Sequence, residues 1–316
     1  MQDVDGRVAF VTGGCSGIGL GIALAFARAG LHVVATSRRR PHLDESAALF
    51  AAAGLDVHVM QLDVTDADAV ERAAAATEER YGRVHVLVNN AGIGIIGPVS
   101  QARRDDWDWI IDVNIKGVAH GLQAFLPRIR AHGEGGHIVN TASMGGLLPV
   151  SAGLYCLTKA GIIALSETLH IELAPENIGV SAYIPGPVHS NLGASSAARP
   201  ERYADSGYPP PPPPDPGRPP LRLPFMSYEE AGERVLQGVR RNDLFILTHP
   251  EFRDGVRERA EALLNAFPDE PLNAERAAAI TFLTSHPVYR AEAGKQPPGP
   301  PPAVRQPIRD GAGRPR

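Results

Sequence analysis

From Val8 onward, the chain alternates short β-branched runs with longer stretches of helical periodicity. This alternation is typical of a parallel sheet that is covered by helices on both faces. The runs that predict strands lie at residues 8–11, 32–35, 57–60, 84–88, 137–140, 180–184 and 244–247. The stretches that predict helices lie at residues 18–29, 44–53, 67–81, 106–131, 154–174, 228–241 and 252–267. The sequence therefore predicts an α/β fold with a single doubly wound parallel sheet of seven strands, flanked by helices.

Two proline-rich stretches interrupt this pattern. Residues 209–214 are six consecutive prolines, and residues 297–302 are prolines apart from Gly299. Because proline fits neither a helix interior nor a central strand, we expect residues 194–224 to form a substrate loop or lid within one domain of residues 1–267. We expect residues 268–316 to form a C-terminal extension whose tail is disordered from about residue 295.

The charge of the chain excludes some classes of partner. The formal net charge of −4 offers no basic surface for a phosphate backbone, so we expect no nucleic-acid partner. The sequence contains no apolar run of about 18 residues, the length that spans a membrane. Asp3 and Asp5 stand where a secretory signal would need a basic start and an apolar core. These features predict a cytoplasmic protein with no membrane partner.

Metal-binding residue types are scattered. The two cysteines, Cys15 and Cys156, have the spacing of neither a zinc site nor a disulfide framework. The eleven histidines include no helical His-x-x-x-His pair. We therefore expect no metal site.

A glycine-rich turn, Thr-Gly-Gly-Cys-Ser-Gly-Ile-Gly at residues 12–19, lies between the first predicted strand and the first predicted helix. Glycines at this place permit a tight turn and let a pyrophosphate approach the backbone, while free N–H groups and the helix dipole attract it. The alternative is a turn that is rich in glycine and binds nothing. Its position between a strand and a helix favours a dinucleotide cofactor.

The end of the second predicted strand indicates which dinucleotide binds. An acidic residue there pairs with the ribose hydroxyls of NAD, whereas a basic residue accommodates the 2′-phosphate of NADP. This chain has Ser37 and Arg38 at that place and no carboxylate. We therefore predict a preference for NADP(H), with NAD(H) as the second option. For Arg39 and Arg40 a solvated arginine run is the alternative interpretation.

Tyr155 and Lys159 form a candidate proton-transfer pair. A phenol has a pKa of about 10, so it acts as an acid or base at neutral pH only if its ionised form is stabilised. Positions i and i+4 share one helix face, so the ammonium of Lys159 would stand near the hydroxyl of Tyr155 and favour the phenolate. Ser143, from another element, would hold the substrate oxygen. Because this spacing also arises by chance, the interpretation depends on the surrounding motifs.

The glycine turn, Ser143, Tyr155 and Lys159 occur together with Asn-Asn-Ala-Gly at residues 89–92, Asn114 and Pro-Gly at residues 185–186. In this order they resemble the short-chain dehydrogenase/reductase family. The glycine pattern is the Gly-x-x-x-Gly-x-Gly of that family and differs from the Gly-x-Gly-x-x-Gly of two-domain dehydrogenases. The resemblance spans about residues 6–192, resumes at about residue 244, and implies a Rossmann-type fold.

The resemblance implies a cofactor-binding role for each matching residue. The glycine turn would contact the phosphates, Asp63 and Val64 would meet the adenine, and Asn90 would line the ribose. Lys159 would bind the nicotinamide ribose, and the residues after the sixth predicted strand would meet the carboxamide. The predicted cofactor-binding residues are Gly13, Ser16, Gly17, Ile18, Gly19, Ser37, Arg38, Asp63, Val64, Asn90, Tyr155, Lys159, Pro185, Gly186, Val188 and Ser190.

The resemblance also implies four catalytic residues, Asn114, Ser143, Tyr155 and Lys159. Tyr155 would exchange a proton with the substrate oxygen while a hydride passes between the adjacent carbon and the nicotinamide. Ser143 would orient that oxygen, and Asn114 would hold a water that links Lys159 to solvent. The alternatives are that Asn114 satisfies a helix kink and that Ser143 caps a turn.

A narrower resemblance concerns the substrate. Residues 106–114, 190–203 and 247–253 are similar to a subgroup with a long substrate loop and a C-terminal extension, which includes lignin Cα-dehydrogenases and ketoreductases of bacterial secondary metabolism. The lignin enzymes favour NAD and carry an acidic residue where this chain has Ser37. We therefore expect NADP(H)-dependent interconversion of a secondary alcohol and a ketone in a bulky apolar or aromatic small molecule. The alternatives are an NAD-dependent dehydrogenase of benzylic or cyclic alcohols and a non-catalytic dinucleotide-binding regulator.

Small side chains indicate self-assembly. Val113, Gly117 and Gly121 form a ridge on the helix at residues 106–131, and Ala160 and Ala164 form another on the helix of Tyr155. Such ridges permit close helix packing, and in the family these two helices meet their symmetry mates. We expect a homodimer or homotetramer, and the alternative is packing of the ridges on the chain's own sheet.

Overall fold

The computed structural model describes residues 1–149, 152–208 and 224–301. The six consecutive prolines at residues 209–214 lie outside the described residues, and so does the predicted tail from residue 302. What the sequence predicts for these stretches stays a prediction. The chain divides into two units, one that contains Met1–Thr248 and one that contains His249–Gly299.

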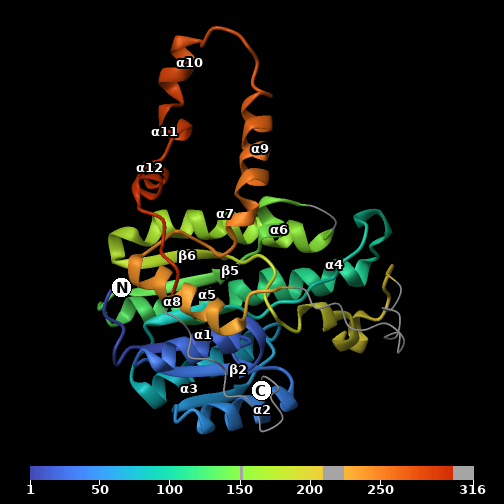
Figure 1. Cartoon of the computed structure of the whole chain (residues 1–316), viewed down its shortest axis with the longest axis vertical. Coiled ribbons are helices and arrows are strands. Elements are labelled where there is room, and N and C mark those ends of the chain that lie inside the picture. The colour runs from blue at the N-terminus through green and yellow to red at the C-terminus, as the bar shows by residue number, and fades with distance from the viewer. Residues whose placement is uncertain (150–151, 209–223, 302–316) are drawn as a thin grey trace. The chain divides into compact units, whose positions relative to one another are not determined.

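The strands of the first unit form one parallel sheet (Figure 1). Within the described residues it has seven strands in the order β3-β2-β1-β4-β5-β6-β7. The strands are β1 (Val8–Val11), β2 (His32–Ser37), β3 (Val57–Gln61), β4 (Val86–Asn89), β5 (Gly136–Thr141), β6 (Ile178–Ile184) and β7 (Phe245–Leu247). The strand order reverses at β1, which pairs with β2 on one side and β4 on the other. The predicted doubly wound α/β fold is confirmed.

Helices cover both faces of this sheet. They are α1 (Gly17–Arg28), α2 (Arg40–Ala52), α3 (Ala67–Tyr81), α4 (Arg104–Ile111), α5 (Gly117–Ala131), α6 (Met144–Leu147), α7 (Leu154–Leu173) and α8 (Tyr228–Arg241), with the short turns η1 (Val99–Gln101) and η3 (Ala174–Glu176). Ala9 and Val11 of β1 are buried with α1, α2 and α8, whereas Val8 and Phe10 are buried with α3, α5 and α7. A strand that is apolar at every position therefore serves two cores. No helix in the described part of the chain is long and apolar enough to cross a bilayer.

The helix predicted at residues 106–131 is interrupted. It consists of α4, the π-helical turn η2 (Asp112–Lys116) and α5. Residues 112–116 contain neither proline nor glycine, so the sequence carries no local signal for the break. The break coincides with Asn114, whose side chain bonds the main chain of Ile93 outside the helix. Asn114 therefore lies in a helix distortion, and its side chain bonds groups outside that helix.

The small residues of α5 pack inside the molecule. A Cβ at Gly117 would lie 2.8 Å from Cγ2 of Val64, and a Cβ at Gly121 would overlap the side-chain oxygen of Asn89 on β4. The intrachain alternative therefore holds for this ridge, because its glycines make room for the chain's own side chains. Ala160 and Ala164 on α7, by contrast, are exposed.

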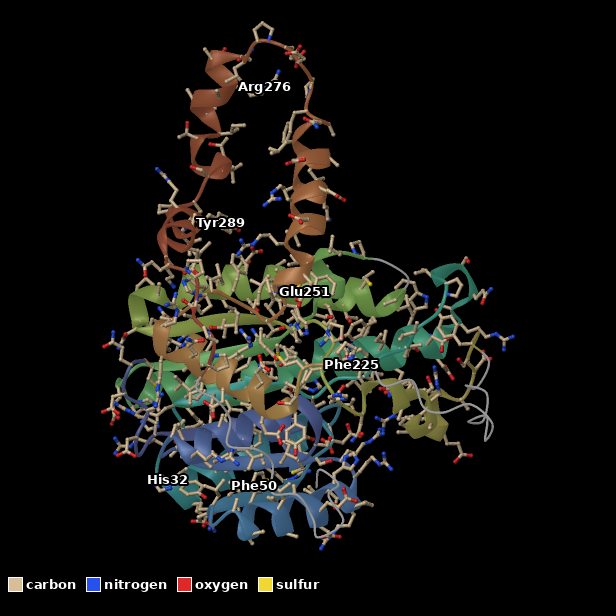
Figure 2. All side chains as sticks on the ribbon, viewed as in Figure 1. His32, Phe50, Phe225, Glu251, Arg276 and Tyr289 are labelled. Carbon is tan, nitrogen blue, oxygen red and sulfur yellow. The ribbon has the colours of Figure 1, made fainter. Side chains whose placement is uncertain are left out.

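The second unit consists of short helices, and none of its side chains that the structure describes is buried. Its elements are η6 (Pro250–Phe252), α9 (Arg253–Leu264), α10 (Ala274–Ala279), α11 (Thr281–Thr284) and α12 (Pro287–Gly294). No residue of α9, α10 or α12 is buried, and Figure 2 labels Arg276 and Tyr289 among their exposed side chains. The division after Thr248 comes earlier than the boundary expected after residue 267. A helix that buries no side chain, such as α9, adds nothing to a sheet core.

The crossing of α1 and α8 is unusually close. A Cβ at Gly21 on α1 would overlap the carbonyl oxygen of Tyr228 on α8. A Cβ at Gly232 on α8 would likewise overlap the main chain of Gly21. Two facing glycines therefore set the position of α1, the helix that begins at the glycine-rich turn.

We expect Gly21→Ala to lower the free energy of unfolding by about 1–3 kcal/mol, because the added methyl group overpacks the crossing. Urea denaturation followed by circular dichroism measures the change. Gly193→Ala is the control, because a Cβ there would meet no atom within 4 Å, and it should change stability by less than about 0.5 kcal/mol. Equal midpoints for Gly21→Ala and the wild type would contradict the steric argument.

Candidate active site

A cavity of about 240 Å³ lies at the carboxyl ends of the strands. In an open parallel sheet this edge, at the point where the strand order reverses, is where ligands bind. The predicted site residues that line it are Gly13, Ser16, Gly17, Ile18, Ser37, Arg38, Asp63, Val64, Asn90, Tyr155, Lys159, Pro185 and Ser190. The predicted residues outside this lining are Gly19, Asn114, Ser143, Gly186 and Val188.

The glycine-rich turn brings the backbone to the cavity wall. Gly13 and Gly17 have φ angles of +65° and +50°, a region that favours glycine. A Cβ at Gly19 would overlap the carbonyl oxygen of Gly13, so Gly19 allows the turn to close and does not line the cavity. Gly17 and Ile18 begin α1 at the cavity, and the first turn of α1 contains no acidic residue. The N–H groups and the dipole of α1 therefore suit an anion such as a phosphate.

Asn90 and Thr12 join the glycine turn to β4. The Nδ2 of Asn90 donates to the carbonyl oxygen of Thr12 at 3.1 Å. The hydroxyl of Thr12 accepts the N–H groups of Asn90 and Ala91 at 2.9 and 3.0 Å and donates to the carbonyl of Val88 at 3.2 Å. Sequence reasoning assigned no role to Thr12, although it is the first residue of the glycine-rich turn. The turn is thus held at the strand-order reversal by side-chain hydrogen bonds.

The side chains of Arg38 and Arg202 lie close together where β2 and β3 end, away from Tyr155. Arg38 donates to the carbonyl oxygen of Ala198 at 2.8 Å and lies 4.0 Å from the carboxylate of Asp63. Arg202 lies 3.9 Å from the same carboxylate and donates to the hydroxyl of Thr65 at 2.8 Å. Two guanidinium groups share one carboxylate, so this end carries an excess of positive charge that suits a further phosphate.

Tyr155 and Lys159 lie one turn apart at the start of α7, and both line the cavity. The ammonium of Lys159 lies 5.5 Å from the centroid of the Tyr155 ring and donates a 2.7 Å hydrogen bond to the carbonyl of Thr141. Burial lowers the pKa of Lys159 to about 8. Sequence reasoning did not identify Thr141, because its main chain and not its side chain makes this contact.

The pKa of Tyr155 differs in direction from the sequence-based expectation. The spacing to Lys159 predicts a lowered pKa, whereas in the structure burial of the phenol dominates and raises it. A hydrogen bond with Ser143 lowers the pKa by a smaller amount. Tyr155 therefore carries its proton at neutral pH in this environment.

Ser143 makes the capping contact that was the alternative considered for it, and its contact with the substrate oxygen stays a prediction. It is the N-cap of α6, where its hydroxyl accepts the N–H of Gly145 at 3.1 Å. The same side chain is hydrogen-bonded to Tyr155. The capping bond fixes the rotamer of Ser143, and this places its hydroxyl beside that of Tyr155.

Asn114 is buried, with 1% of its surface exposed. Its Oδ1 accepts the N–H of Ile93 at 2.9 Å, and its Nδ2 donates to the carbonyl of Ile93 at 3.0 Å and to the hydroxyl of Thr158 at 3.1 Å. A Cβ at Gly92 would lie 3.3 Å from Asn114 Oδ1 and 3.5 Å from Lys159 Nζ. The side chain thus joins η2, α7 and the segment after β4 beside Lys159, and the water link expected at Asn114 stays a prediction.

The residues after β6 also hold the cavity wall in place. Pro185 lines the cavity, and the N–H of Gly186 donates to the hydroxyl of Thr248 at 3.1 Å. Val188 forms a parallel bridge with Met226 and is 7% exposed. Gly186 and Val188 therefore position this segment from behind the lining.

One group of potential metal ligands occurs within the described ranges, namely His85, His132 and Glu134. Each imidazole accepts a main-chain N–H at Nδ1 and donates from Nε2, His85 to Glu134 and His132 to a main-chain carbonyl. Neither ring therefore directs a lone pair at a metal. Arg7 and Arg83 pair with Glu134, and burial, aided by Arg7, lowers the pKa of His85 to about 4. We assign no metal to this hydrogen-bonded group.

Comparisons with known proteins find similar dehydrogenases. Residues 7–201 match the family model described as short chain dehydrogenase. A C alpha-dehydrogenase of Sphingobium sp. strain SYK-6 is 35% identical over 268 residues, which cover 84% of this chain and 88% of that protein. The apo form of LigD from Sphingobium sp. strain SYK-6 has a TM-score of 0.71 and 31% identity, covering 85% of this chain and 100% of that chain. A short chain dehydrogenase/reductase from Burkholderia phymatum in complex with NAD has a TM-score of 0.76 and 31% identity, covering 86% of this chain and 100% of that chain.

The burial of Lys159 predicts a dependence of stability on pH. An unfolded lysine keeps its proton up to a pKa of about 10.4, whereas folded Lys159 releases it near pH 8. Between these values the unfolded state binds more protons, so the contribution of Lys159 to the free energy of unfolding rises with pH. The free energy of unfolding of the wild type minus that of Lys159→Met should therefore rise from about pH 8 to about pH 10. The rise should be at most about 1.4 kcal/mol per pH unit.

Chemical denaturation at a series of pH values measures this difference. Lys116→Met is the control, because the Lys116 ammonium is 61% exposed and pairs with Asp112, which raises its pKa. The control should show no rise over the same range. A difference between wild type and Lys159→Met that is independent of pH would contradict the lowered pKa.

Proposed function

The chain belongs to the short-chain dehydrogenase family, and from this premise we propose that it is an NADP(H)-dependent oxidoreductase that interconverts a secondary alcohol and a ketone. Family membership makes it an oxidoreductase that acts on CH–OH groups with a nicotinamide dinucleotide. The observation that carries the proposal is the group of half-buried Ser143 and Tyr155 with buried Lys159 at the edge of a cavity that begins at the glycine turn. These residues fit a dinucleotide, because α1 offers N–H groups to its phosphates.

When bound, the nicotinamide supplies or accepts the hydride. Tyr155 is the general acid or base, and burial keeps its hydroxyl protonated at neutral pH. A protonated Tyr155 is ready to donate to a carbonyl oxygen, which is the reducing direction. Ser143 donates a second hydrogen bond to the same oxygen. Lys159, held by the carbonyl of Thr141, keeps a positive charge beside the phenol below about pH 8 and so supports ionisation of Tyr155 as its proton leaves.

The proposed preference for NADP(H) is supported by the end of β2. Arg38 lines the cavity, its side chain is 35% exposed, and Ser37 leaves the strand end without a carboxylate. The guanidinium of Arg38 donates to a neutral acceptor, the carbonyl of Ala198, and a 2′-phosphate could replace this acceptor with a charged one. An NAD-dependent dehydrogenase is the second candidate, and the NAD complex of the Burkholderia phymatum neighbour favours it.

The proposed substrate is a bulky apolar or aromatic small molecule. Ile93 and Leu192 line the cavity, and Ile96 nearby in the chain is 66% exposed. The similarity to a C alpha-dehydrogenase favours a benzylic alcohol among such substrates. A non-catalytic regulator is the alternative of another class, and the buried Tyr155 and Lys159 pair weighs against it. We also propose a homodimer or homotetramer that uses the exposed Ala160 and Ala164 of α7.

Tyr155→Phe should reduce turnover by at least about 100-fold, because it removes the hydroxyl that carries the proton. The dissociation constant for NADPH should change by less than about threefold, because the ring remains in place. A panel of aromatic, cyclic and steroid-like ketones and alcohols, followed by NADPH absorbance, identifies a substrate for the assay. Tyr289→Phe, at an exposed tyrosine of the second unit, is the control and should keep wild-type activity. Substantial activity in Tyr155→Phe would refute the assignment.

Arg38→Gln should lower kcat/KM for NADPH by about tenfold or more, because a hydrogen bond to a charged group is lost. The value for NADH should change by less than about twofold. The control is Arg40→Gln, at an arginine that is 74% exposed and pairs with Asp44. Steady-state rates with both cofactors measure the effect. A wild-type kcat/KM for NADH equal to or above that for NADPH would overturn the NADP(H) preference.

A further inference from the structure

A segment of residues 190–208, called the strap below, crosses the cavity. It contains η4 (Leu192–Ala198) and η5 (Glu201–Tyr203). The strap residues that line the cavity are Ser190, Asn191, Leu192, Ala194, Ser195 and Ala198. With the strap in place the cavity is about 240 Å³, below the roughly 300–1,000 Å³ of ordinary ligand sites. The strap therefore covers part of the site in which a dinucleotide would lie between the glycine turn and Tyr155.

Two contacts of the strap with the cavity wall are partly exposed, whereas a third, the hydrogen bond from the N–H of Gly94 to the hydroxyl of Ser195 at 3.1 Å, is buried. Ala198 accepts a hydrogen bond from Arg38, whose side chain is 35% exposed. Arg202, which is 55% exposed, donates to the hydroxyl of Thr65. Exposed polar contacts contribute little net free energy, because water replaces them readily. These contacts can be exchanged when a ligand arrives.

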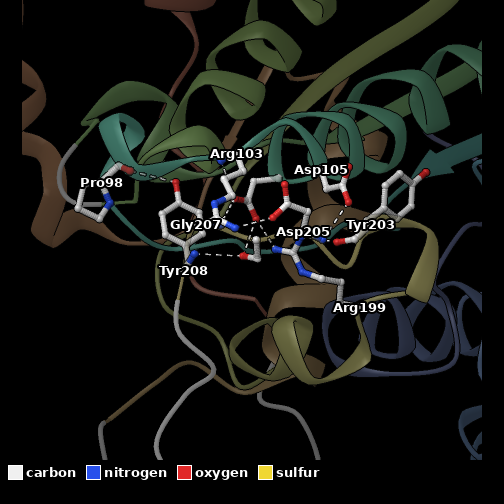
Figure 3. Close-up of polar contacts among 10 residues, drawn as sticks. Pro98, Arg103, Asp105, Arg199, Tyr203, Asp205, Gly207 and Tyr208 are labelled. Carbon is white, nitrogen blue, oxygen red and sulfur yellow. Dashed lines mark hydrogen bonds and ion pairs between the residues drawn. The ribbon is translucent and has the colours of Figure 1, made fainter.

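On its other side the strap is anchored to a fully buried carboxylate. Asp106, in the first turn of α4, is 0% exposed. One of its oxygens accepts hydrogen bonds from the guanidinium of Arg199 at 2.6 Å and from the hydroxyl of Ser206 at 2.8 Å. The other accepts the N–H groups of Gly207 at 2.8 Å and Arg103 at 2.9 Å. Both oxygens of the carboxylate are therefore fully used, and three of the four donors come from the strap (Figure 3).

Arg199 is mostly buried beside it. Its side chain is 12% exposed, and its guanidinium lies 4.6 Å from the ring centroid of Trp109, which is itself 0% exposed. A second guanidinium nitrogen donates to the carbonyl of Tyr203 at 3.0 Å. The Tyr203 hydroxyl donates to Asp112, the first residue of η2, at 2.7 Å. The anchor thus joins the strap to α4 and to the turn that carries Asn114.

We propose that Asp106, acting through Arg199, is a positioning residue for the dinucleotide that holds the strap across the cavity and slows release of the bound cofactor. The inference rests on the proposed dinucleotide-binding function. Breaking a buried ion pair leaves an uncompensated charge, whereas breaking an exposed contact costs little. A strap that is held by a buried ion pair at α4 and by exposed contacts at Arg38 and Arg202 opens first at these two arginines and remains attached at α4, which is how a loop closes over a ligand.

The chain provides a reporter for this movement. Trp107 and Trp109 are its only two tryptophans. In a Trp107→Phe background the remaining tryptophan lies directly under the guanidinium of Arg199. Its emission, and energy transfer from it to bound NADPH or NADH, reports both the anchor and the cofactor. Stopped-flow displacement of each reduced cofactor by an excess of its oxidised form gives the release rate without any substrate.

Arg199→Gln should raise the release rates of NADPH and NADH alike by about tenfold or more, because a hydrogen bond between charged groups is lost. The emission of Trp109 should change in the same variant before any cofactor is added. Arg199→Lys keeps a cation beside Asp106 and should recover most of the slow release. Ser206→Ala removes one neutral donor without leaving an unpaired charge, and should raise the rates by about threefold. If Arg199→Gln fails to fold, the release rates of Ser206→Ala test the proposal in its place.

The matched control is Arg103→Gln. It removes an ion pair with Asp205 of the same strap whose two side chains are 61% and 62% exposed, and it should change release by less than about twofold. Folded Arg199→Gln and Ser206→Ala proteins that release both cofactors at the wild-type rate would show that the ion pair only stabilises the fold, and would overturn the proposal. A wild-type chain that binds neither dinucleotide would overturn the proposed function as well, so binding by the wild type distinguishes the two failures.

Discussion

Parallel pairing of all strands in the sheet brings their carboxyl ends to one edge, and the reversal of strand order at β1 leaves space there for a ligand. The functional groups depend on this geometry. The glycine turn follows β1, Arg38 follows β2, Asn90 follows β4, and Thr141 ends β5. Residues that are far apart in the sequence therefore meet because strand register, and not local chain length, sets the distances between them.

Burial decides the chemistry at this edge. The same desolvation that lowers the pKa of Lys159 to about 8 raises the pKa of Tyr155, so both groups move toward their neutral forms. Hydrogen bonds partly offset this loss of solvation. The ammonium of Lys159 donates to the carbonyl of Thr141, and Tyr155 is hydrogen-bonded to Ser143. A protonated phenol beside a lysine that titrates in a physiological range suits donation of a proton to a carbonyl oxygen.

The strap shows why the environment of an ion pair matters more than its presence. Arg103 and Arg199 both pair with aspartates at α4 and the strap, at 2.6 Å in each case. Only the pair of Arg199 with Asp106 is buried, and only there would a broken contact leave a charge without solvent. Two ion pairs of equal length therefore differ in how strongly they hold the strap.

Local periodicity and sterics determined much of this protein from the sequence alone. The alternation of strands and helices, the glycine turn, the i, i+4 spacing of Tyr155 and Lys159, and the missing carboxylate at Ser37 depend only on neighbouring residues. Tertiary structure alone decided the π-helical turn at Asn114, the inward packing of Gly121, the raised pKa of Tyr155 and the pairing of Asp106 with Arg199, 93 residues away. Each of these depends on which distant groups share one buried space, and that is set by chain folding rather than by any local pattern.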